Sequence, residues 1–233
     1  KTASEDKLYD DALMRINEMI SQGTGAIEIK SGYGLSLEAE LKMLRVINKL
    51  KQTLPIPIKA TFLGAHAIPL EFKENRKAYI DLIINEMLPA IANEQLADYC
   101  DVFCERNYFS SEETMQILNA AKQYGIGAKV HAEQLSNSGG VIAGVNSKAI
   151  SVDHLEFVGE AEIEALSNSE TMPVILPGAA FFLSLPHPPA KKMIKAGLPL
   201  AIASDFNPGS SPSGNINLMN AIACIQYGLT PEE

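Results

Sequence analysis

The feature that most constrains the fold is a series of short apolar runs, rich in β-branched residues, that alternate with helical patterns. There are seven such runs, at residues 24–30, 57–66, 99–105, 126–133, 149–156, 172–177 and 198–207. Between them, apolar residues recur at helical spacing over 4–22, 36–52, 74–95, 111–124, 137–144, 160–168, 189–196 and 214–227. Strands that alternate with helices predict right-handed crossovers and a parallel sheet.

Two architectures contain a parallel sheet of this kind. Several runs are almost continuously apolar, which is typical of strands covered by helices outside and filled by packed side chains inside. The alternative, an open doubly wound sheet, usually shows a glycine-rich phosphate turn after an early strand. The string SGYGL at 31–35 is too short for that turn and lacks its spacing. We therefore predict an α/β fold of the (β/α)8 TIM-barrel type, with residues 1–233 forming one barrel domain.

The number of runs bears on how much of a barrel is present. A closed barrel of this type needs eight strands, whereas the chain shows seven runs. The sequence opens with a helical pattern and ends at LTPEE, just after the helix that follows the last run. We expect a first strand to lie outside it, so that the chain is the middle of a longer protein.

Four residues able to do chemistry stand at or near the ends of these runs: His66, His131, His154 and Asp205. In a parallel barrel the active site is built on the C-terminal ends of the strands. Neighbouring strands lie about 4.8 Å apart, so His131 and His154, which end consecutive runs, are expected to meet. Either histidine alone could equally be a hydrogen-bonded structural residue. Together they favour a metal site, because imidazole is a common metal ligand.

Asp205 follows the apolar string LAIAS and begins the turn-rich loop SDFNPGSSPSGN. A carboxylate buried beside an apolar run is costly unless it has a partner. A strand-end aspartate can bind a metal and can also accept a proton from water that the metal activates. The alternative is an aspartate that only caps its own loop. The pattern predicts a metal-assisted hydrolase with Asp205 at its centre.

Other polar residues are expected to have smaller roles. Tyr33 lies between two glycines, which would let its phenol approach a ligand, although surface packing is the alternative. Glu105, at the end of the third run, is expected to support the site from behind. His187 stands among prolines and is expected in a loop outside the site. The acidic helix faces at 38–40 and 160–164 are expected to be solvated.

Composition excludes several classes of partner. A net charge of −9 and a pI of about 5.0 argue against nucleic acid and anionic membranes, which attract basic surfaces. No apolar run approaches the 18 or more residues that a membrane-spanning helix needs. The three cysteines have no metal-binding spacing, and Cys100 and Cys104 are expected on one face of a strand as reduced core thiols. Such thiols are typical of a cytosolic protein.

Six strings carry a resemblance to a known family. They are EIKSGYGL (28–35), TFLGAHAIP (61–69), VHAEQLSNSGG (130–140), VDHLE (152–156), LPGAAF (176–181) and SDFNPGSSP (204–212). In that order they resemble the imidazolonepropionases, a family of the metal-dependent amidohydrolase superfamily that acts in histidine degradation. The strand-end His, His and Asp alone would indicate only the superfamily, whereas KSGYGL, LGAHA and SDFNPG together indicate this family.

The resemblance implies one divalent zinc or iron ion and hydrolytic opening of 4-imidazolone-5-propanoate to N-formimidoyl-L-glutamate. By motif, His131 and Asp205 would bind the metal, Asp205 would also move the proton, and His154 would lie beside the scissile carbonyl. The residues that would contact substrate or product are Tyr33, His66, Gln134, Asn207, Gly209 and Ser210. Such an enzyme is commonly a cytoplasmic homodimer that acts on a small molecule.

One departure from the family pattern concerns the metal. The family supplies two further ligands from a His-x-His pair on its first barrel strand and an arginine that helps to hold the propionate. No His-x-His occurs in this sequence, so the pair and the arginine are expected to precede Lys1, as is most of the family's small flanking β-domain. The chain alone is therefore expected to bind metal weakly. Two alternatives remain open. One is another metal-dependent amidohydrolase, such as a cyclic amidase or a heterocycle aminohydrolase, and the other is a metal-free barrel fragment that acts as a binding module.

Overall fold

A curved parallel sheet forms the centre of the molecule in the computed structural model, which describes residues 2–233. Its strands are β1 (Ile27–Lys30), β2 (Ile58–Ala65), β3 (Tyr99–Cys104), β4 (Gly127–Ala132), β5 (Ser151–His154), β6 (Met172–Ile175) and β7 (Ala201–Ile202). Each strand pairs in parallel with the next along the chain, so the seven follow one another in sequence order. A doubly wound sheet would reverse its strand order. The prediction of a barrel-type fold is therefore confirmed.

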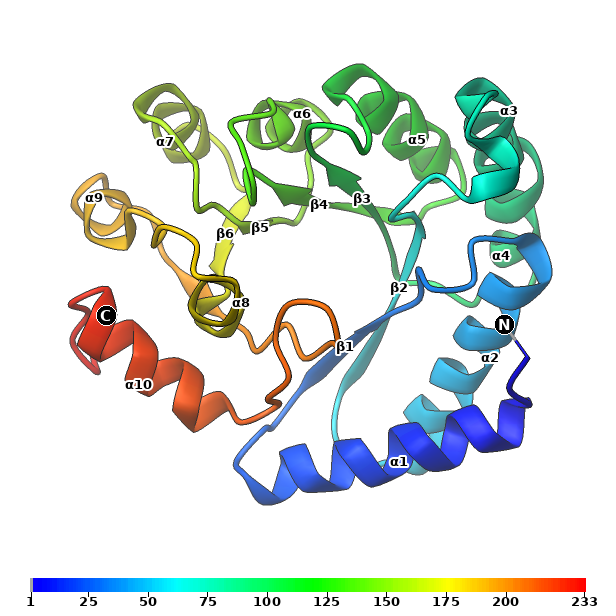
Figure 1. Ribbon diagram of the computed structural model, residues 1–233, viewed down its shortest axis with the longest axis horizontal. Helices are drawn as coiled ribbons and strands as arrows, with labels where there is room; N and C mark the ends of the chain where they lie inside the picture. The colour runs from blue at the N-terminus through cyan, green and yellow to red at the C-terminus, as the bar shows by residue number, and fades with distance from the viewer. Residues whose placement is uncertain (1) are drawn as a thin grey trace.

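Helices lie around the outside of this sheet (Figure 1). They are α1 (Glu5–Ser21), α2 (Leu37–Thr53), α3 (Arg76–Leu82), α4 (Leu88–Asn93), α5 (Ser111–Gln123), α6 (Gly140–Asn146), α7 (Glu160–Ser167), α8 (Pro177–Leu183), α9 (Ala190–Lys195) and α10 (Ile216–Gln226). A 3-10 turn, η1 (Leu70–Phe72), precedes α3, and a π-helical segment, η2 (Ile83–Met87), joins α3 to α4. No helix among residues 2–233 has the length and apolarity needed to cross a membrane.

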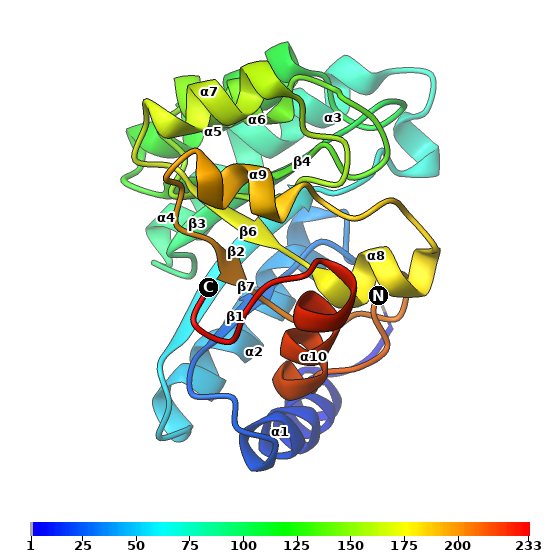
Figure 2. The ribbon, with the colours of Figure 1, turned by 90° about the vertical axis from the view of Figure 1, so that its left-hand side faces the viewer.

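Most of the predicted elements are present, with two differences. The helix α8 was not predicted, because its sequence follows directly on the strand β6 (Figure 2). The last run, 198–207, was predicted as a full strand, yet only Ala201–Ile202 pairs. Beyond these two residues the chain turns away from the sheet, and Asp205 adopts a left-handed backbone with φ of 50°. Asp205 therefore lies outside the paired part of the sheet, at the start of the loop that follows β7.

The outward face of the sheet is an apolar layer against the helices. Phe62, Val102, Val130 and Val152 are fully buried there. The cysteines Cys100 and Cys104 share this face with Val102 and are buried free thiols, as predicted. Alternation along a strand places these residues on one side and their neighbours on the other.

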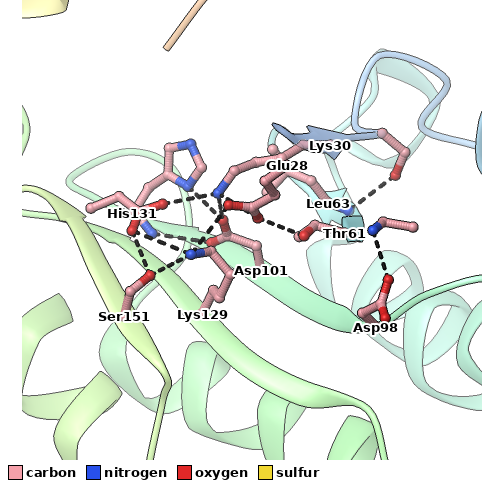
Figure 3. A network of polar contacts seen from close by, with 12 residues as sticks. Glu28, Lys30, Thr61, Leu63, Asp98, Asp101, Lys129, His131 and Ser151 are labelled. Atoms are coloured by element: carbon pink, nitrogen blue, oxygen red, sulfur yellow. Dashed lines mark hydrogen bonds and ion pairs between the residues drawn. The ribbon is translucent and has the colours of Figure 1, made fainter. Parts of the chain in front are cut away.

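The inward face is charged, which corrects the expectation of an apolar filling. Its side chains at alternate strand positions are Glu28, Lys30, Thr61, Asp101, Lys129, Ser151 and Asp153, and they contact one another (Figure 3). Barrel interiors are usually packed with branched aliphatic residues. In this sheet, ion pairs and hydrogen bonds take the place of that packing and form the floor beneath the strand ends.

Candidate metal centre and its surroundings

Three residues predicted from sequence meet at the C-terminal ends of the strands. His131 lies in β4, His154 ends β5, and Asp205 follows β7. Each offers one ligand atom, and these three atoms lie within 4.8 Å of one another. The two imidazole rings have centroids 5.2 Å apart. The histidines are buried, whereas Asp205 is half-buried. The sheet therefore brings together the residues whose meeting was expected from their positions at strand ends.

Left-handed backbone conformations surround this cluster. In the segments that carry the cluster, the non-glycine residues with positive φ are Glu133 (52°), His154 (91°), Leu155 (72°) and Asp205 (50°). Each such residue costs of order 1–3 kcal/mol and persists only where its surroundings enforce it. Regular alternation would turn His154 to the face opposite Asp153. The positive φ of His154 breaks the alternation where its ring lies beside that of His131.

A carboxylate beneath the cluster holds His131 at two points. Asp101 Oδ2 lies 3.0 Å from His131 Nδ1. Asp101 Oδ1 accepts the backbone N–H of His131 at 3.1 Å. With Nδ1 facing this carboxylate, Nε2 is the ring nitrogen left for a metal, and partners of this kind commonly orient metal-binding histidines. Asp101 was not predicted from the sequence.

Lys30 supplies the positive charge of the floor. Its Nζ lies 2.5 Å from Asp101 Oδ2 and 2.9 Å from Asp153 Oδ2. Burial acts to lower the pKa of Lys30, but Asp101, Asp153 and Glu28 outweigh it and raise that pKa well above its usual value. Asp101, His131 and Asp153 also form a possible metal-binding group. Because Lys30 already neutralises the two carboxylates of that group, the cluster of His131, His154 and Asp205 is the better candidate for a metal centre.

The carboxylates of the floor remain ionised. Burial acts to raise the pKa of Asp101, yet its interactions with His131 and Lys30 hold that pKa far below its usual range. Burial likewise acts to raise the pKa of Asp153, but Lys30 and Lys129 outweigh burial and lower that pKa. For His154, burial acts to lower the pKa, and the carboxylates of Glu156 and Asp205 raise it above the usual value.

Aromatic rings connect the cluster to the loop after β1. The Tyr33 ring lies edge-on to His66 with centroids 5.4 Å apart, and Phe103 lies 5.9 Å from both His66 and His131. His66 Nδ1 is 3.2 Å from the carbonyl oxygen of Gly32. Burial and then the carboxylate of Asp205 raise the pKa of Tyr33, whereas burial and then His131 lower that of His66. Both residues therefore lie within electrostatic reach of the cluster.

The loop after Asp205 orients that residue. The Ser210 hydroxyl donates to Asp205 Oδ2 at 2.8 Å, and Asn207 Nδ2 donates to the Asp205 carbonyl at 2.7 Å. The N–H groups of Gly209 and Ser210 donate to Asn207 Oδ1. Sequence reasoning placed Asn207, Gly209 and Ser210 against the substrate and missed this support of Asp205. An Asn two residues after an Asp, in a turn-rich string, was the available signal.

Two further predictions concern Glu105, expected to support the site, and His187, expected in a loop outside it. Gln134 is buried in the loop after β4, where Glu105 accepts the N–H groups of Leu135 and Ser136 at 2.8 and 3.2 Å. The supporting position expected for Glu105 therefore matches its contacts. His187 is exposed in the loop before α9, as expected of a loop residue, and its ring centroid lies 4.7 Å from that of Tyr227.

A surface hollow of about 670 Å³ lies beside the cluster rather than over it. Its lining includes Arg76, Glu105, Tyr108 and Ser136, and none of the three cluster residues. The hollow follows the loops after β2, β3 and β4, so it adjoins the segment that carries Gln134.

The donor set fits a transition metal. Two imidazoles and one carboxylate are ligands that zinc and non-haem iron accept. The buried Nδ1 of His154 makes no hydrogen bond within residues 2–233 and lies 3.7 Å from Glu156 Oε1, so the cluster contains an imidazole nitrogen whose hydrogen-bonding capacity is unused. We conclude that the residues present can hold one divalent ion.

Comparison with known proteins finds relatives similar to this chain. No established family model matches the chain. The imidazolonepropionase of Flavobacterium johnsoniae is 57% identical over 230 residues, which are 99% of this chain and 56% of that protein. That of Thermoanaerobacter pseudethanolicus is 46% identical over 234 residues, which are 100% of this chain and 56% of that protein.

Along its whole length, the chain is similar in sequence to imidazolonepropionases. It spans somewhat more than half the length of the relatives it matches. The six strings that suggested imidazolonepropionase are therefore part of a similarity that extends over the whole chain.

Solved structures agree on the fold. A zinc-bound adenosine deaminase from Xanthomonas campestris superposes with a TM-score of 0.66 at 14% identity, over 97% of this chain and 52% of that one. A guanine deaminase from C. acetobutylicum reaches 0.70 at 14% identity, over 94% of this chain and 55% of that one. At this identity the likeness concerns the fold alone. The chain thus shares its barrel architecture with an adenosine deaminase and a guanine deaminase.

Proposed function

We propose that the protein is a metal-dependent hydrolase that opens the ring of 4-imidazolone-5-propanoate to N-formimidoyl-L-glutamate. The observation that carries the proposal is the meeting of His131, His154 and Asp205 within 4.8 Å, in a chain 46–57% identical to imidazolonepropionases along its length. We further propose that the 233 residues form one barrel domain, and that the enzyme works in the cytoplasm as a homodimer.

The metal in this proposal is one zinc or iron ion, held by His131 and Asp205 with His154 within reach. When bound, such an ion makes water nucleophilic at neutral pH and polarises a carbonyl. The amide-like C–N bond of the ring requires that help. The two contacts of Asp101 keep the His131 ring in one orientation, so the site is prepared before substrate arrives.

Asp205 moves the proton. Its carboxylate accepts a proton from the attacking water and passes it to the ring nitrogen that departs. The Ser210 hydroxyl occupies Oδ2 and thereby orients the carboxylate. His154 faces the carbonyl oxygen as negative charge develops on it, and a hydrogen bond from the imidazole stabilises that charge.

The remaining residues position the substrate. Tyr33 and His66 contact the imidazolone ring from the loops after β1 and β2, and Gln134 does so from the loop after β4. Asn207, Gly209 and Ser210 line the same side as Asp205 and contact substrate or product. These contacts accelerate the reaction by holding the ring in the reactive geometry.

The experiment is a substrate comparison on the purified full-length protein, reconstituted with zinc or with iron(II), because this chain alone is expected to bind metal weakly and to be inactive. Turnover of 4-imidazolone-5-propanoate is expected only with metal, at a stoichiometry of about one ion per chain by elemental analysis. A cyclic imide such as hydantoin, and guanine as an aminated heterocycle, serve as comparison substrates. Faster turnover of either one, or equal activity in the metal-free protein, would overturn the proposal.

A further inference from the structure

A buried carboxylate behind the loop of Tyr33 has no place in the function described so far. Glu40, in the first turns of α2, is fully buried. Its Oε2 accepts the N–H of Gly32 at 2.9 Å. Its Oε1 accepts the N–H groups of Gly34 and Leu35 at 2.9 and 2.8 Å. The expectation of a solvated acidic face at 38–40 is therefore wrong for Glu40, while Glu38 is exposed.

The contacts of Glu40 are specific to one loop. A buried carboxylate is costly unless hydrogen bonds satisfy it, and charge-assisted bonds to backbone N–H groups are among the strong ones. Glu40 directs three of them to residues 32–35. Its place in the first turns of a helix also favours negative charge. The geometry thus couples the start of α2 to the backbone on both sides of Tyr33.

The packing of the two glycines leaves this loop little freedom. A Cβ on Gly34 would lie 2.7 Å from Ala39 Cβ and 2.9 Å from the backbone nitrogen of Glu40. A Cβ on Gly32, whose φ is 105°, would lie 2.8 Å from the carbonyl oxygen of Leu63. The loop is therefore held between α2 and β2, and close approach is possible only with glycine at these positions.

Tyr33 itself depends on its backbone for its position. Its side chain is 53% exposed, and the ring contact that it makes is the edge-on approach to His66. Side-chain packing on one face alone leaves a half-exposed ring mobile. The direction of the phenol is therefore decided by the Gly32–Leu35 backbone to which it is attached.

We propose that Glu40 is a positioning residue, which fixes the Gly32–Leu35 loop and so presents the Tyr33 phenol to the substrate. The inference rests on the proposed function in one respect, the contact between Tyr33 and the imidazolone. Glu40 does not touch the substrate. It acts through the backbone of the loop.

The first test measures the loop without any substrate. Glu40→Gln keeps the shape of the side chain but places an NH2 group against at least one N–H of the loop. Hydrogen exchange should accelerate by roughly tenfold or more at the amide that faces the new NH2 group, because the bond that protects it is lost; this amide is Gly32 when the Gln oxygen stays toward Gly34 and Leu35. The control Glu38→Gln, on the exposed face of the same helix, should leave exchange unchanged. Unchanged exchange at these three amides in Glu40→Gln would overturn the proposal.

The second test asks whether Glu40 acts through Tyr33. In the metal-loaded protein, Glu40→Gln should lower kcat/KM for 4-imidazolone-5-propanoate by about tenfold, and Tyr33→Phe by about 10- to 150-fold. The double variant should be no more than about twofold worse than Tyr33→Phe alone, because the two residues share one effect. Multiplication of the two losses would show independent roles and overturn the proposal.

Two other outcomes can be told apart from these: failure of the proposed function, and a role of Glu40 in the stability of the whole fold. A wild-type protein that does not turn over the imidazolone would overturn the proposed function, and the exchange at residues 32–35 would still decide whether Glu40 fixes the loop. Faster exchange throughout the protein, with a lower thermal midpoint in Glu40→Gln, would mean that Glu40 stabilises the whole fold and would overturn a specific role at the loop.

Discussion

At the scale of single residues, two functional residues of the site, His131 and Asp205, are each held by two polar contacts. Asp101 holds both the ring and the backbone of His131. Asp205 receives the Ser210 hydroxyl at its carboxylate and the Asn207 amide at its carbonyl. Groups that are held at two points lose little freedom when a reaction begins. This is the arrangement that an enzyme needs for catalysis by positioning.

The residue whose replacement should cost most is Asp205. In Asp205→Asn the amide is a poor proton acceptor and a weaker metal ligand, although its oxygen can still accept from Ser210. We expect turnover to fall by roughly 10²–10⁴-fold, with reduced metal content and a nearly unchanged thermal midpoint. Steady-state kinetics and elemental analysis measure both effects. The exposed Asp10→Asn serves as control, and activity of Asp205→Asn within a few-fold of wild type would remove Asp205 from the reaction.

At the scale of elements, polar side chains and close packing hold the strands to the helices. Asp98, just before β3, joins three partners from α2 and β2. It accepts from Lys51 Nζ at 2.7 Å, from Lys59 Nζ at 3.1 Å and from the N–H of Ala60 at 2.8 Å. Burial acts to raise the pKa of Asp98, but these three partners outweigh it and lower that pKa below the usual value.

The sign of the resulting pH dependence follows from the lowered pKa. The unfolded chain binds a proton at Asp98 more readily than the folded protein, so this stability is present above pH of about 4 and is lost as pH falls through the folded pKa. In Asp98→Asn the free energy of unfolding should fall by about 1 kcal/mol at pH 7, a value typical of partly exposed pairs. Urea unfolding at pH 7 and pH 3 measures it. A difference from wild type that did not shrink at pH 3 would contradict this account.

The helix α6 lies close to β5 because it carries a glycine at the contact. A Cβ on Gly144 would come within 2.6 Å of Val152 Cγ1, and valine cannot turn aside easily because its rotamers are restricted. In Gly144→Ala, the gain in helix propensity is about 1 kcal/mol, whereas overpacking costs about 1–3 kcal/mol. We expect a net loss of stability by thermal unfolding. Gly25→Ala, with no atom within 4 Å of its added Cβ, should be nearly neutral, and equal effects of the two changes would refute the packing argument.

At the scale of the whole molecule, the curvature of the sheet creates the charged floor. Lys30, Asp101 and Asp153 come from the alternating strands β1, β3 and β5, as do the residues of one layer in a barrel. In a flat sheet, β1 and β5 would lie about 19 Å apart, at about 4.8 Å per strand. That distance is beyond the reach of a lysine side chain. The 2.9 Å contact between Lys30 and Asp153 therefore exists because the sheet curves.

Removal of the central cation tests this network. Lys30→Met leaves Asp101 and Asp153 buried without their shared partner, and breaking a buried pair costs about 3–5 kcal/mol. Urea unfolding should show a loss of that size. The control Lys77→Met removes a lysine whose side chain is 83% exposed and should cost less than about 1 kcal/mol. A loss below 1 kcal/mol in Lys30→Met would mean that water reaches the floor and solvates both carboxylates.

The sequence by itself determined the order of strands and helices and the strand-end positions of His131, His154 and Asp205. Those features are local, because apolar periodicity and turn residues report the backbone of their own segment. Only the tertiary structure decided that Asp101 and Lys30 lie beneath His131, that Ser210 orients Asp205, and that Glu40 holds the loop of Tyr33. The polar residues that alternate along IEIK, YCDVFC and AKVHA were a signal of a charged interior. Their partners could not be read from the chain, because a carboxylate is satisfied by whichever donors the curvature of the sheet and the left-handed turns bring within 3 Å of it.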